Sequence, residues 1–285
     1  MKLDALLHRP FPAVTEAYSK RDTMLYALGV GAGADPLDKT ELPFVYEADL
    51  RTIPSMASVL GYPGFWLRDP ELGVDWLKLL HGEQHLEFYA PLAPQGEVTG
   101  QFRVLGVVDK GPDKGAIVYF EKLLSDAATG EKLCAVRSTY FLRGDGGCGG
   151  YGEPITAASA LPERAPDFTV DLPTLPRQAL IYRLSGDYNP IHADPEAAAQ
   201  AGFKAPILHG LCTFGIACRG LVTAVCKGEP SRLESMSVRF STPVYPGETV
   251  RLEVFHERAA TRFRARVLER DVVVLDRGEA KIALG

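Results

Sequence analysis

The sequence lacks three features that would each point to a particular class of protein. Basic residues are not in excess, because 36 Asp and Glu outnumber 31 Lys and Arg for a net charge of -5, and the basic stripe typical of nucleic-acid binders is missing. The five cysteines are odd in number and form no Cys-x-x-Cys pair, which argues against a disulfide framework and a structural zinc site. We therefore expect reduced cysteines, as is usual in the cytoplasm, and no nucleic-acid partner.

A membrane span and a targeting segment are also missing from the sequence. The most apolar stretch, residues 211–226, is interrupted by Arg219, so we expect no transmembrane helix. The first twelve residues carry charges among their leucines and are too polar for a signal peptide. The last two residues, Leu284 and Gly285, do not form a peroxisomal signal. These features predict a cytoplasmic protein that does not bind membranes.

Two segments of the chain resemble each other. An aromatic residue at Phe88 is followed by Pro91, Pro94 and Gly-Glu at 96–97, and the same order begins at Phe240 and ends in Gly-Glu at 247–248. Such internal similarity indicates a duplicated unit. A Pro-rich stretch separates the two copies and is typical of a linker. We therefore predict a first repeat over residues 1–152, a linker over 153–176 and a second repeat over 177–285.

The hydrophobic pattern predicts an α+β fold. Residues 210–226 form a long apolar helix candidate that should be buried, and an antiparallel sheet wrapped around it is the simplest arrangement. The first repeat has only a weaker helix candidate over 74–80, so we expect its central helix to be reduced and to leave an empty tunnel of helix width. Strands are expected over 101–108, 116–124, 132–142, 235–240, 249–258, 261–269 and 272–283.

A compact loop in the second repeat carries three functional groups within six residues. Asp187 and Asn189 lie between Gly186 and Pro190, and His192 lies two residues after Pro190. Gly186 and Pro190 both favour a turn. A carboxylate and an imidazole can share one water molecule, with one group accepting its proton and the other orienting it. The amide can help to hold that water. The alternative is an ordinary turn, in which Asp and Asn are common.

Gly210 offers a second functional group. The segment 206–210 leads directly into the long helix, and the first backbone N–H groups of a helix have no partner within it. Because glycine has no side chain, its N–H is open to close approach by a ligand carbonyl, and the helix terminus adds partial positive charge for an oxyanion. The alternative is that Gly210 only begins the helix.

Three other patterns do not carry a function. Residues 144–149 fit Gly-x-Gly-x-x-Gly, but further glycines and a proline follow in place of the helix that a dinucleotide site needs. Cys212 lies near His209, yet nothing in the sequence stabilises its thiolate. His209 is too far along the chain from His192 to be paired with it from sequence alone. We therefore predict no cofactor and no metal.

The segments over 182–192, 206–213 and 239–247 together resemble the hydratase 2 family, also called MaoC-like hydratases. They are most similar to the two-repeat type that occurs in peroxisomal multifunctional enzyme type 2. Residues 26–32 and 80–84 resemble segments of the first repeat of that type. The similarity covers nearly the whole chain, and its most specific signals are the active loop and the Pro-Ile-Leu-His-Gly segment.

This resemblance implies a double hot-dog fold and the hydration of trans-2-enoyl-CoA to (3R)-3-hydroxyacyl-CoA, with CoA present only as part of the substrate. The family's catalytic residues correspond to Asp187 and His192 with Asn189 beside them, and its oxyanion amide corresponds to Gly210. The implied acyl-CoA contacts are His81, Gly82, Lys110, Tyr188, Pro190, Ile191 and Phe240.

Two other functions remain open at this point: an acyl-CoA thioesterase of the same fold, and a non-catalytic acyl-CoA or lipid binder. The reduced helix of the first repeat favours medium, long or bulky acyl chains, and CoA and acyl carrier protein are both possible carriers. A homodimer is the default expectation for this fold.

Overall fold

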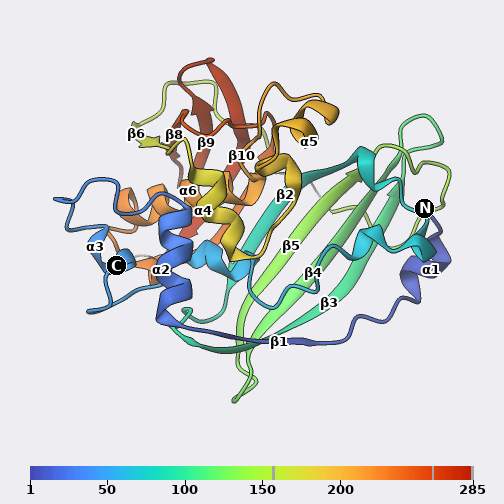
Figure 1. Cartoon of the computed structure of the whole chain (residues 1–285), viewed down its shortest axis with the longest axis horizontal. Helices are drawn as coiled ribbons and strands as arrows, with labels where there is room; N and C mark the ends of the chain where they lie inside the picture. Colours follow the sequence, from blue (N-terminus) through green and yellow to red (C-terminus); the bar gives the residue numbers. More distant parts are fainter. Residues whose placement is uncertain (156–157, 259, 284–285) are drawn as a thin grey trace.

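Ten antiparallel strands form one continuous sheet in the computed structural model, which describes residues 1–155, 158–258 and 260–283 (Figure 1). The strand order is β1-β3-β4-β5-β2-β7-β10-β9-β8-β6. The strands of the first half are β1 (Val14–Tyr18), β2 (Leu79–Phe88), β3 (Gly96–Asp109), β4 (Ala116–Asp126) and β5 (Lys132–Leu142). Those of the second half are β6 (Phe168–Pro173), β7 (Leu233–Phe240), β8 (Thr249–His256), β9 (Thr261–Val267) and β10 (Val272–Ile282).

The two halves of the sheet have the same topology. The order β1-β3-β4-β5-β2 in the first half repeats as β6-β8-β9-β10-β7 in the second, and the antiparallel β2–β7 pair joins them. His85 on β2 pairs with Ser237 on β7. These two residues are as far apart in sequence as Phe88 and Phe240, the first residues of the similar segments. An approximate twofold axis therefore passes between His85 and Ser237, as a duplication predicts.

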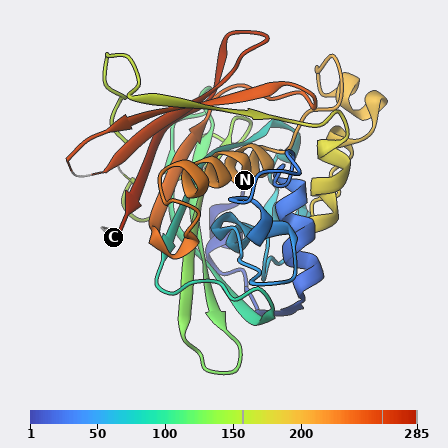
Figure 2. The same cartoon turned by 90° about the vertical axis from the view of Figure 1, so that its left-hand side faces the viewer.

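The long helix α6 (Gly210–Ala224) is enclosed by the second half of the sheet (Figure 2). All but its end residues are buried, which confirms the predicted helix and its position. Glycines let it approach its neighbours closely: a Cβ at Gly215 would lie 2.5 Å from Val30, and one at Gly220 would lie 2.8 Å from Leu172. The arrangement of a sheet around a central helix is the hot-dog unit, and the chain contains two such sheets in tandem.

The first half has short turns where the second has α6. The 3-10 turns η1 (Pro54–Ser58), η2 (Trp66–Arg68), η3 (Pro70–Leu72) and η4 (Trp76–Lys78) cross its part of the sheet. The helix predicted over 74–80 is wrong, because these residues form η4 and the start of β2. The predicted empty tunnel is also wrong, because side chains of the turns and strands pack there in one apolar cluster. Its members include Trp66, Leu67, Leu72, Phe102, Val118, Phe120 and Leu142.

Lys122 on β4 fixes the turn η1 against the sheet. Its side chain is fully buried, and Nζ donates hydrogen bonds to the backbone oxygens of Ala57 (2.9 Å), Ser58 (3.0 Å) and Leu60. Burial lowers the pKa of Lys122 to about 7. Three carbonyls at the end of a short turn are thus satisfied by one side chain.

The remaining helices lie around the sheet edges and in the connections. They are α1 (Leu3–Leu7), α2 (Lys20–Gly29), α3 (Leu42–Val45), α4 (Gln178–Tyr182), α5 (Pro195–Gln200) and the 3-10 turns η5 (Arg183–Ser185), η6 (Pro190–His192) and η7 (Pro230–Arg232). In α5, Asp194 accepts a hydrogen bond from the Glu196 N–H at 2.8 Å and Pro195 occupies the first position, as sequence rules for helix starts predict. Helices α2 and α4 pack against each other through Tyr26 and Tyr182.

The predicted linker contains a strand. β6 lies within 153–176 and pairs with β8, from Phe168 opposite Val254 to Pro173 opposite Thr249. The part of the stretch before β6 runs beside the second half of the sheet, where Arg262 donates to Ser159 and Arg277 to Ala158. Residues 156–157 of this predicted linker and the last two residues of the predicted second repeat, 284–285, lie outside the described residues.

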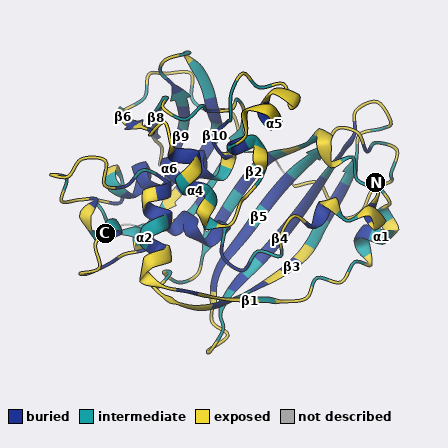
Figure 3. Cartoon of the chain, viewed as in Figure 1, coloured by how far each residue is buried: buried dark blue, intermediate teal, exposed yellow. Residues whose placement is uncertain are grey.

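Burial follows the sheet and α6, and exposed residues lie in loops and on outer helices such as α2 and α5 (Figure 3). All five cysteines are free, and Cys148 alone among them is not buried. Among the described residues, no helix has the length and apolar character needed to cross a bilayer.

Candidate active site

The loop after α4 holds its shape through two side-chain turns. Gly186 ends η5 with φ 113°, a conformation that residues with a side chain rarely adopt. Asp187 Oδ1 then accepts from the Asn189 N–H at 3.1 Å, and Asn189 Oδ1 accepts from the Ile191 N–H at 3.3 Å. Such Asx turns are the usual reason for Asp and Asn in tight loops. Asp187 is exposed, whereas the loop ends in the buried His192.

The protonation of His192 follows from its backbone contact. Nδ1 lies 2.8 Å from the Ile207 carbonyl oxygen. Because a carbonyl only accepts, Nδ1 carries the hydrogen in the neutral ring, which leaves Nε2 with a free lone pair. Burial lowers the pKa of His192, and this effect outweighs the hydrogen bond to Ile207 and the charge of Asp187. The ring is therefore neutral at pH 7 and its Nε2 can accept a proton.

His209 joins the same cluster, although its distance along the chain from His192 does not predict this position. Its ring stacks on that of His192 with a centroid distance of 3.7 Å and an angle of 27°. Its Nε2 lies 3.1 Å from the backbone oxygen of Asp187, 22 residues earlier in the chain. The signal that would have identified it is its position directly before the helix that begins at Gly210.

Asp187, His192 and His209 are close enough to contact one small molecule. One carboxylate oxygen and one ring nitrogen from each histidine all lie within 4.8 Å of one another. Three atoms at such spacing can each lie about 2.8 Å from a common centre, which is the length of a good hydrogen bond. The structure thus brings together the predicted acid–base pair around a position that suits a water molecule.

The same three residues do not form a good metal site. The lone pair of an imidazole nitrogen lies in the ring plane, and the planes of His192 and His209 are nearly parallel and stacked. Both nitrogens would have to turn to meet a zinc ion at about 2.0–2.1 Å. In addition, one nitrogen of each ring is already used by a backbone carbonyl. The absence of a metal requirement remains a prediction.

Gly210 presents its backbone beside this cluster. It is the first residue of α6 and is exposed, in contrast to the buried body of the helix. Within the described part of the chain, its N–H has no hydrogen-bond acceptor. A Cβ at this position would lie 3.5 Å from the ring of Phe240, an ordinary contact. The protein's own packing therefore does not demand glycine here.

His81 continues the site from Phe240 into the first repeat. Its ring centroid lies 4.8 Å from that of Phe240 and 4.9 Å from that of Tyr140. Burial lowers the pKa of His81 to about 4, and its Nε2 is buried without a partner in the described residues. The charge of Asp187 opposes the lowering of the His81 pKa and adds to the raised pKa of Tyr140, which is due mainly to burial. An aromatic wall thus runs from Gly210 across the junction of the two repeats.

Gly82 has a packing reason to be glycine. A Cβ there would lie 2.4 Å from the ring of Phe141, and the β2–β5 register shifts between His81 and Glu83. The resulting bulge breaks the alternation of β2 next to His81. The predicted contact of Gly82 with substrate remains a prediction, because the close approach of Phe141 already explains the residue.

The other predicted contacts occupy the rim. Tyr188 is 60% exposed and lies under the guanidinium of Arg183 at 5.3 Å, while Pro190 is exposed and Ile191 is partly buried. Lys110 is exposed at the turn between β3 and β4. This turn lies at the same end of the sheet as the start of β2 but three strands away, or about 14 Å at the usual strand spacing.

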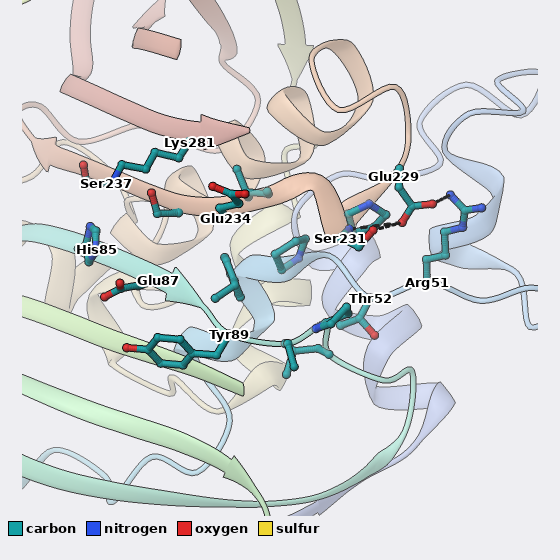
Figure 4. A pocket seen from close by; sticks show the side chains of 18 of the residues that line it. Arg51, Thr52, His85, Glu87, Tyr89, Glu229, Ser231, Glu234, Ser237 and Lys281 are labelled. Atoms are coloured by element: carbon teal, nitrogen blue, oxygen red, sulfur yellow. Dashed lines mark hydrogen bonds and ion pairs between the residues drawn. The ribbon is translucent and has the colours of Figure 1, made fainter. Parts of the chain in front are cut away.

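A hollow of about 780 Å³ lies elsewhere, along β2 and β7 near the ends that are remote from His81 and Phe240 (Figure 4). Its lining includes His85, Glu87, Glu234 and Lys281, with the Arg51–Glu229 ion pair (3.2 Å) at one end. It shares no lining residue with the Asp187 loop. The candidate active site is therefore assigned from converging functional groups and not from the size of a hollow.

Two family models match the chain, one for each half. The model of the MFE-2 hydratase 2 N-terminal domain matches residues 17–144, and that of the MaoC-like domain matches residues 157–277. The second match contains the Asp187 loop and α6.

The chain is also similar to individual hydratases and dehydratases over nearly its whole length. Enoyl-CoA hydratase 2, peroxisomal, of Arabidopsis thaliana is 40% identical over 95% of this chain and 93% of its own length. The 3-hydroxyacyl-thioester dehydratase Y of Mycobacterium tuberculosis is 40% identical over 96% of this chain and 97% of its own. Among solved structures, a MaoC-like dehydratase from Phytophthora capsici superposes with a TM-score of 0.87 at 36% identity, with complete coverage of both chains.

Proposed function

The chain belongs to the MaoC-like hydratase family, and we propose that it is a hydro-lyase that converts trans-2-enoyl-CoA reversibly into (3R)-3-hydroxyacyl-CoA. The observation that carries this proposal is the cluster of Asp187, His192 and His209, whose polar atoms lie within 4.8 Å of one another. Gly210 follows His209 directly and, within the described residues, begins α6 with a free N–H. The activity agrees with the names of two relatives, enoyl-CoA hydratase 2 of Arabidopsis thaliana and 3-hydroxyacyl-thioester dehydratase Y of Mycobacterium tuberculosis. The (3R) configuration is taken from the resemblance to hydratase 2.

Gly210 is the proposed binding point for the thioester carbonyl. A hydrogen bond from its N–H, strengthened by the positive end of α6, draws electron density from the carbonyl and makes C3 of the conjugated enoyl group electrophilic. A single donor of this kind lowers a barrier by roughly 3–4 kcal/mol. Because glycine has no side chain, the thioester carbonyl can approach this N–H beside the ring of Phe240.

His192 is the proposed base. As the water oxygen bonds to C3, Nε2 of His192 accepts one proton of that water, and Asp187 accepts a hydrogen bond from the other. The electron pair of the double bond moves toward the carbonyl, and the proton on His192 then adds to C2. Water thereby supplies both the hydroxyl and the new hydrogen, and no group is consumed.

Asn189 has a smaller role than its position in the motif suggests. Its Oδ1 already accepts from Ile191, so its free donor is the amide nitrogen. We propose that this nitrogen donates to the water or to the Asp187 carboxylate. The main contribution of Asn189 is then to hold the loop in a turn that presents Asp187.

The acyl group extends from Gly210 along Phe240 and His81, and CoA leaves over the exposed rim. Tyr188, Pro190 and Ile191 would contact the CoA arm, and Lys110 is a suitable partner for one of its phosphates. Medium, long or bulky acyl chains remain the expectation from the reduced helix of the first repeat. The apolar cluster around Trp66 and Phe120 would then have to move for the chain to enter. Acyl carrier protein is a possible second carrier.

No cofactor or metal takes part in the proposed reaction. A cytoplasmic location fits the five free cysteines, whereas several relatives are named as peroxisomal. A homodimer is the expected assembly, because proteins of this size commonly form twofold pairs.

The decisive experiment separates hydration from thioester hydrolysis on one substrate. Purified protein is given a panel of trans-2-enoyl-CoA esters from four to sixteen carbons. We expect the ultraviolet absorbance of the conjugated thioester to fall with no release of thiol to a thiol-reactive dye, and chiral chromatography to give the (3R) product. Thiol release at the rate of substrate loss would assign a thioesterase instead. Binding without turnover of any ester would assign a non-catalytic binder.

A further inference from the structure

His209 links the two halves of the candidate active site. Its imidazole contacts the Asp187 loop, because Nε2 lies 3.1 Å from the Asp187 backbone oxygen. Its own backbone leads directly into Gly210 and α6. One residue therefore touches the loop that carries the acid–base pair and begins the helix that carries the oxyanion donor.

The direction of this hydrogen bond is fixed by chemistry. The Asp187 carbonyl oxygen only accepts, so Nε2 of His209 must donate. Burial, with a further contribution from His192, lowers the pKa of His209 to about 4, so the ring stays neutral and keeps one N–H at neutral pH. Its Nδ1 is buried without a partner in the described residues. Within the described residues, the one hydrogen bond of the ring is thus the one to the Asp187 backbone.

The same ring supports His192. The two imidazoles stack with centroids 3.7 Å apart, and Tyr182 packs near His209 with a ring-centroid distance of 5.0 Å. His192 is already held at Nδ1 by Ile207. Contact with His209 over one face leaves His192 little freedom to rotate its Nε2 away from the reacting water.

We propose that His209 is a positioning residue for the hydration reaction: it fixes the Asp187 loop against the start of α6 and so sets the distance between the water-binding groups and the oxyanion donor. This inference rests on the proposed hydratase function. His209 does not itself exchange a proton with substrate. A misplacement of about 1 Å at a catalytic group can cost 10²-fold in rate, so loss of this one contact should be visible in kcat.

Two substitutions separate the hydrogen bond from the ring. His209→Phe keeps a flat ring for stacking but removes the donor, whereas His209→Gln loses the ring but offers an amide N–H close to the position of Nε2. With crotonyl-CoA and 2-decenoyl-CoA as substrates, we expect kcat to fall about tenfold or more in His209→Phe, as one lost hydrogen bond suggests, and to recover to within about threefold of wild type in His209→Gln. KM should stay within about threefold in both, because His209 does not touch the acyl-CoA.

A double-mutant cycle distinguishes positioning from general structural damage. If His209 acts by placing Asp187, its loss has little left to disturb once the carboxylate is gone. Adding His209→Phe to Asp187→Ala should therefore change the residual kcat by less than about twofold. The same tenfold loss in both backgrounds would overturn the proposal, as would a raised KM at unchanged kcat.

Tyr182→Phe is the matched control. It removes one oxygen from a buried ring beside His209 without altering the Asp187 contact, so kcat should remain near that of wild type, and thermal unfolding of all variants shows whether each is folded. The proposed function and the role of His209 would be rejected by different results. A wild-type protein without hydratase activity, or full turnover by Asp187→Ala, rejects the proposed function. Loss in Asp187→Ala with normal His209→Phe rejects only the role of His209.

Discussion

The two repeats share one sheet topology but have filled its concave face differently. In the second repeat the face is occupied by the 15-residue helix α6, whose first residue opens on the candidate active site. In the first repeat the face is crossed by short 3-10 turns and filled by an apolar cluster around Trp66 and Phe120. A duplicated fold therefore tolerates loss of its central helix when side chains refill the space.

The loops that precede these elements differ in the same way. Asp35 in the first repeat accepts from the Leu37 N–H at 2.9 Å, the same Asx turn that Asp187 forms with Asn189. Yet residues 30–50 contain no histidine. The turn itself is therefore a local structural device, and the first repeat lacks a counterpart of His192, the proposed base of the second repeat.

The largest expected effect comes from breaking the acid–base pair of the second repeat. Asp187→Asn and His192→Gln should each lower kcat by about 10³-fold or more, in line with the 10²–10⁴-fold that general acid–base groups contribute. Acyl-CoA binding, followed by isothermal titration calorimetry with a saturated acyl-CoA, should persist. Asp35→Asn is the matched control and should leave kcat unchanged. Near-normal turnover by either active-loop variant would reject the assignment of the site.

The pH dependence of turnover should follow His192. Its pKa is lowered by burial, and the base must be neutral to accept a proton. Activity is therefore expected to be flat near pH 7 and to fall only when the medium becomes acidic enough to protonate the buried ring. His192→Gln should remove this acid limb from whatever residual activity remains.

Alanine substitutions at two glycines of α6, Gly210 and Gly215, should have smaller effects on activity than loss of the acid–base pair, and the two effects should differ in kind. In Gly210→Ala the new methyl lies at an ordinary distance from Phe240, so the fold should be preserved. The methyl nevertheless occupies the space in which a thioester carbonyl must approach the N–H. We expect kcat/KM to fall by about 10²-fold, the lower range for loss of an oxyanion donor.

Gly215→Ala should give the opposite pattern. Its Cβ would lie 2.5 Å from Val30, and such overpacking costs about 1–3 kcal/mol. The melting temperature should drop by several degrees, while the kcat of the folded fraction stays near that of wild type. Equal losses of stability in both variants, with equal activity, would show that Gly210 only begins the helix.

Much of this architecture was predictable because its signals are local. The alternation in strands β3, β4 and β5, the apolar pattern of α6 and the turn residues around Asp187 each depend on neighbours in the sequence. The N-cap of α5 at Asp194 is equally local. In these segments propensity and tertiary structure agree, which is typical of a well-specified fold.

The features that the sequence did not reveal depend on distant contacts. Strand β2 is absent from the predicted strands, and the helix predicted over 74–80 overlaps its first two residues. The register of β2 shifts beside Gly82, where a Cβ would meet Phe141. Strand β6 was hidden in a Pro-rich stretch, since an edge strand tolerates Pro173 at its end. His209 contacts the Asp187 backbone across 22 residues of sequence, so no spacing rule relates the two residues.

The two repeats hold their central elements by different interactions. Apolar packing and one buried side chain, Arg219, which bonds to Glu41 and to the Val30 carbonyl, hold α6. The turn η1 depends on the buried Lys122 and its three carbonyl acceptors. At about pH 8, Lys122→Met should lower the free energy of unfolding by about 2 kcal/mol, because a neutral amine can donate two hydrogen bonds, each worth about 0.5–1.5 kcal/mol. Lys132→Met, at an exposed lysine, is the control and should change it by less than about 0.5 kcal/mol.

The difference in the free energy of unfolding between wild type and Lys122→Met should depend on pH, and this dependence tests whether Lys122 is protonated in the folded chain. Its pKa is about 7 in the folded chain and has an ordinary value near 10.5 when unfolded. Between these values the unfolded state binds the proton and the folded state does not. The free energy of unfolding should therefore rise with pH by up to about 1.4 kcal/mol per unit in wild type, relative to Lys122→Met. Urea titrations at pH 6, 8 and 9.5 measure this difference. Parallel curves would mean that the lysine stays charged and that its carbonyl contacts, more than its burial, determine its protonation.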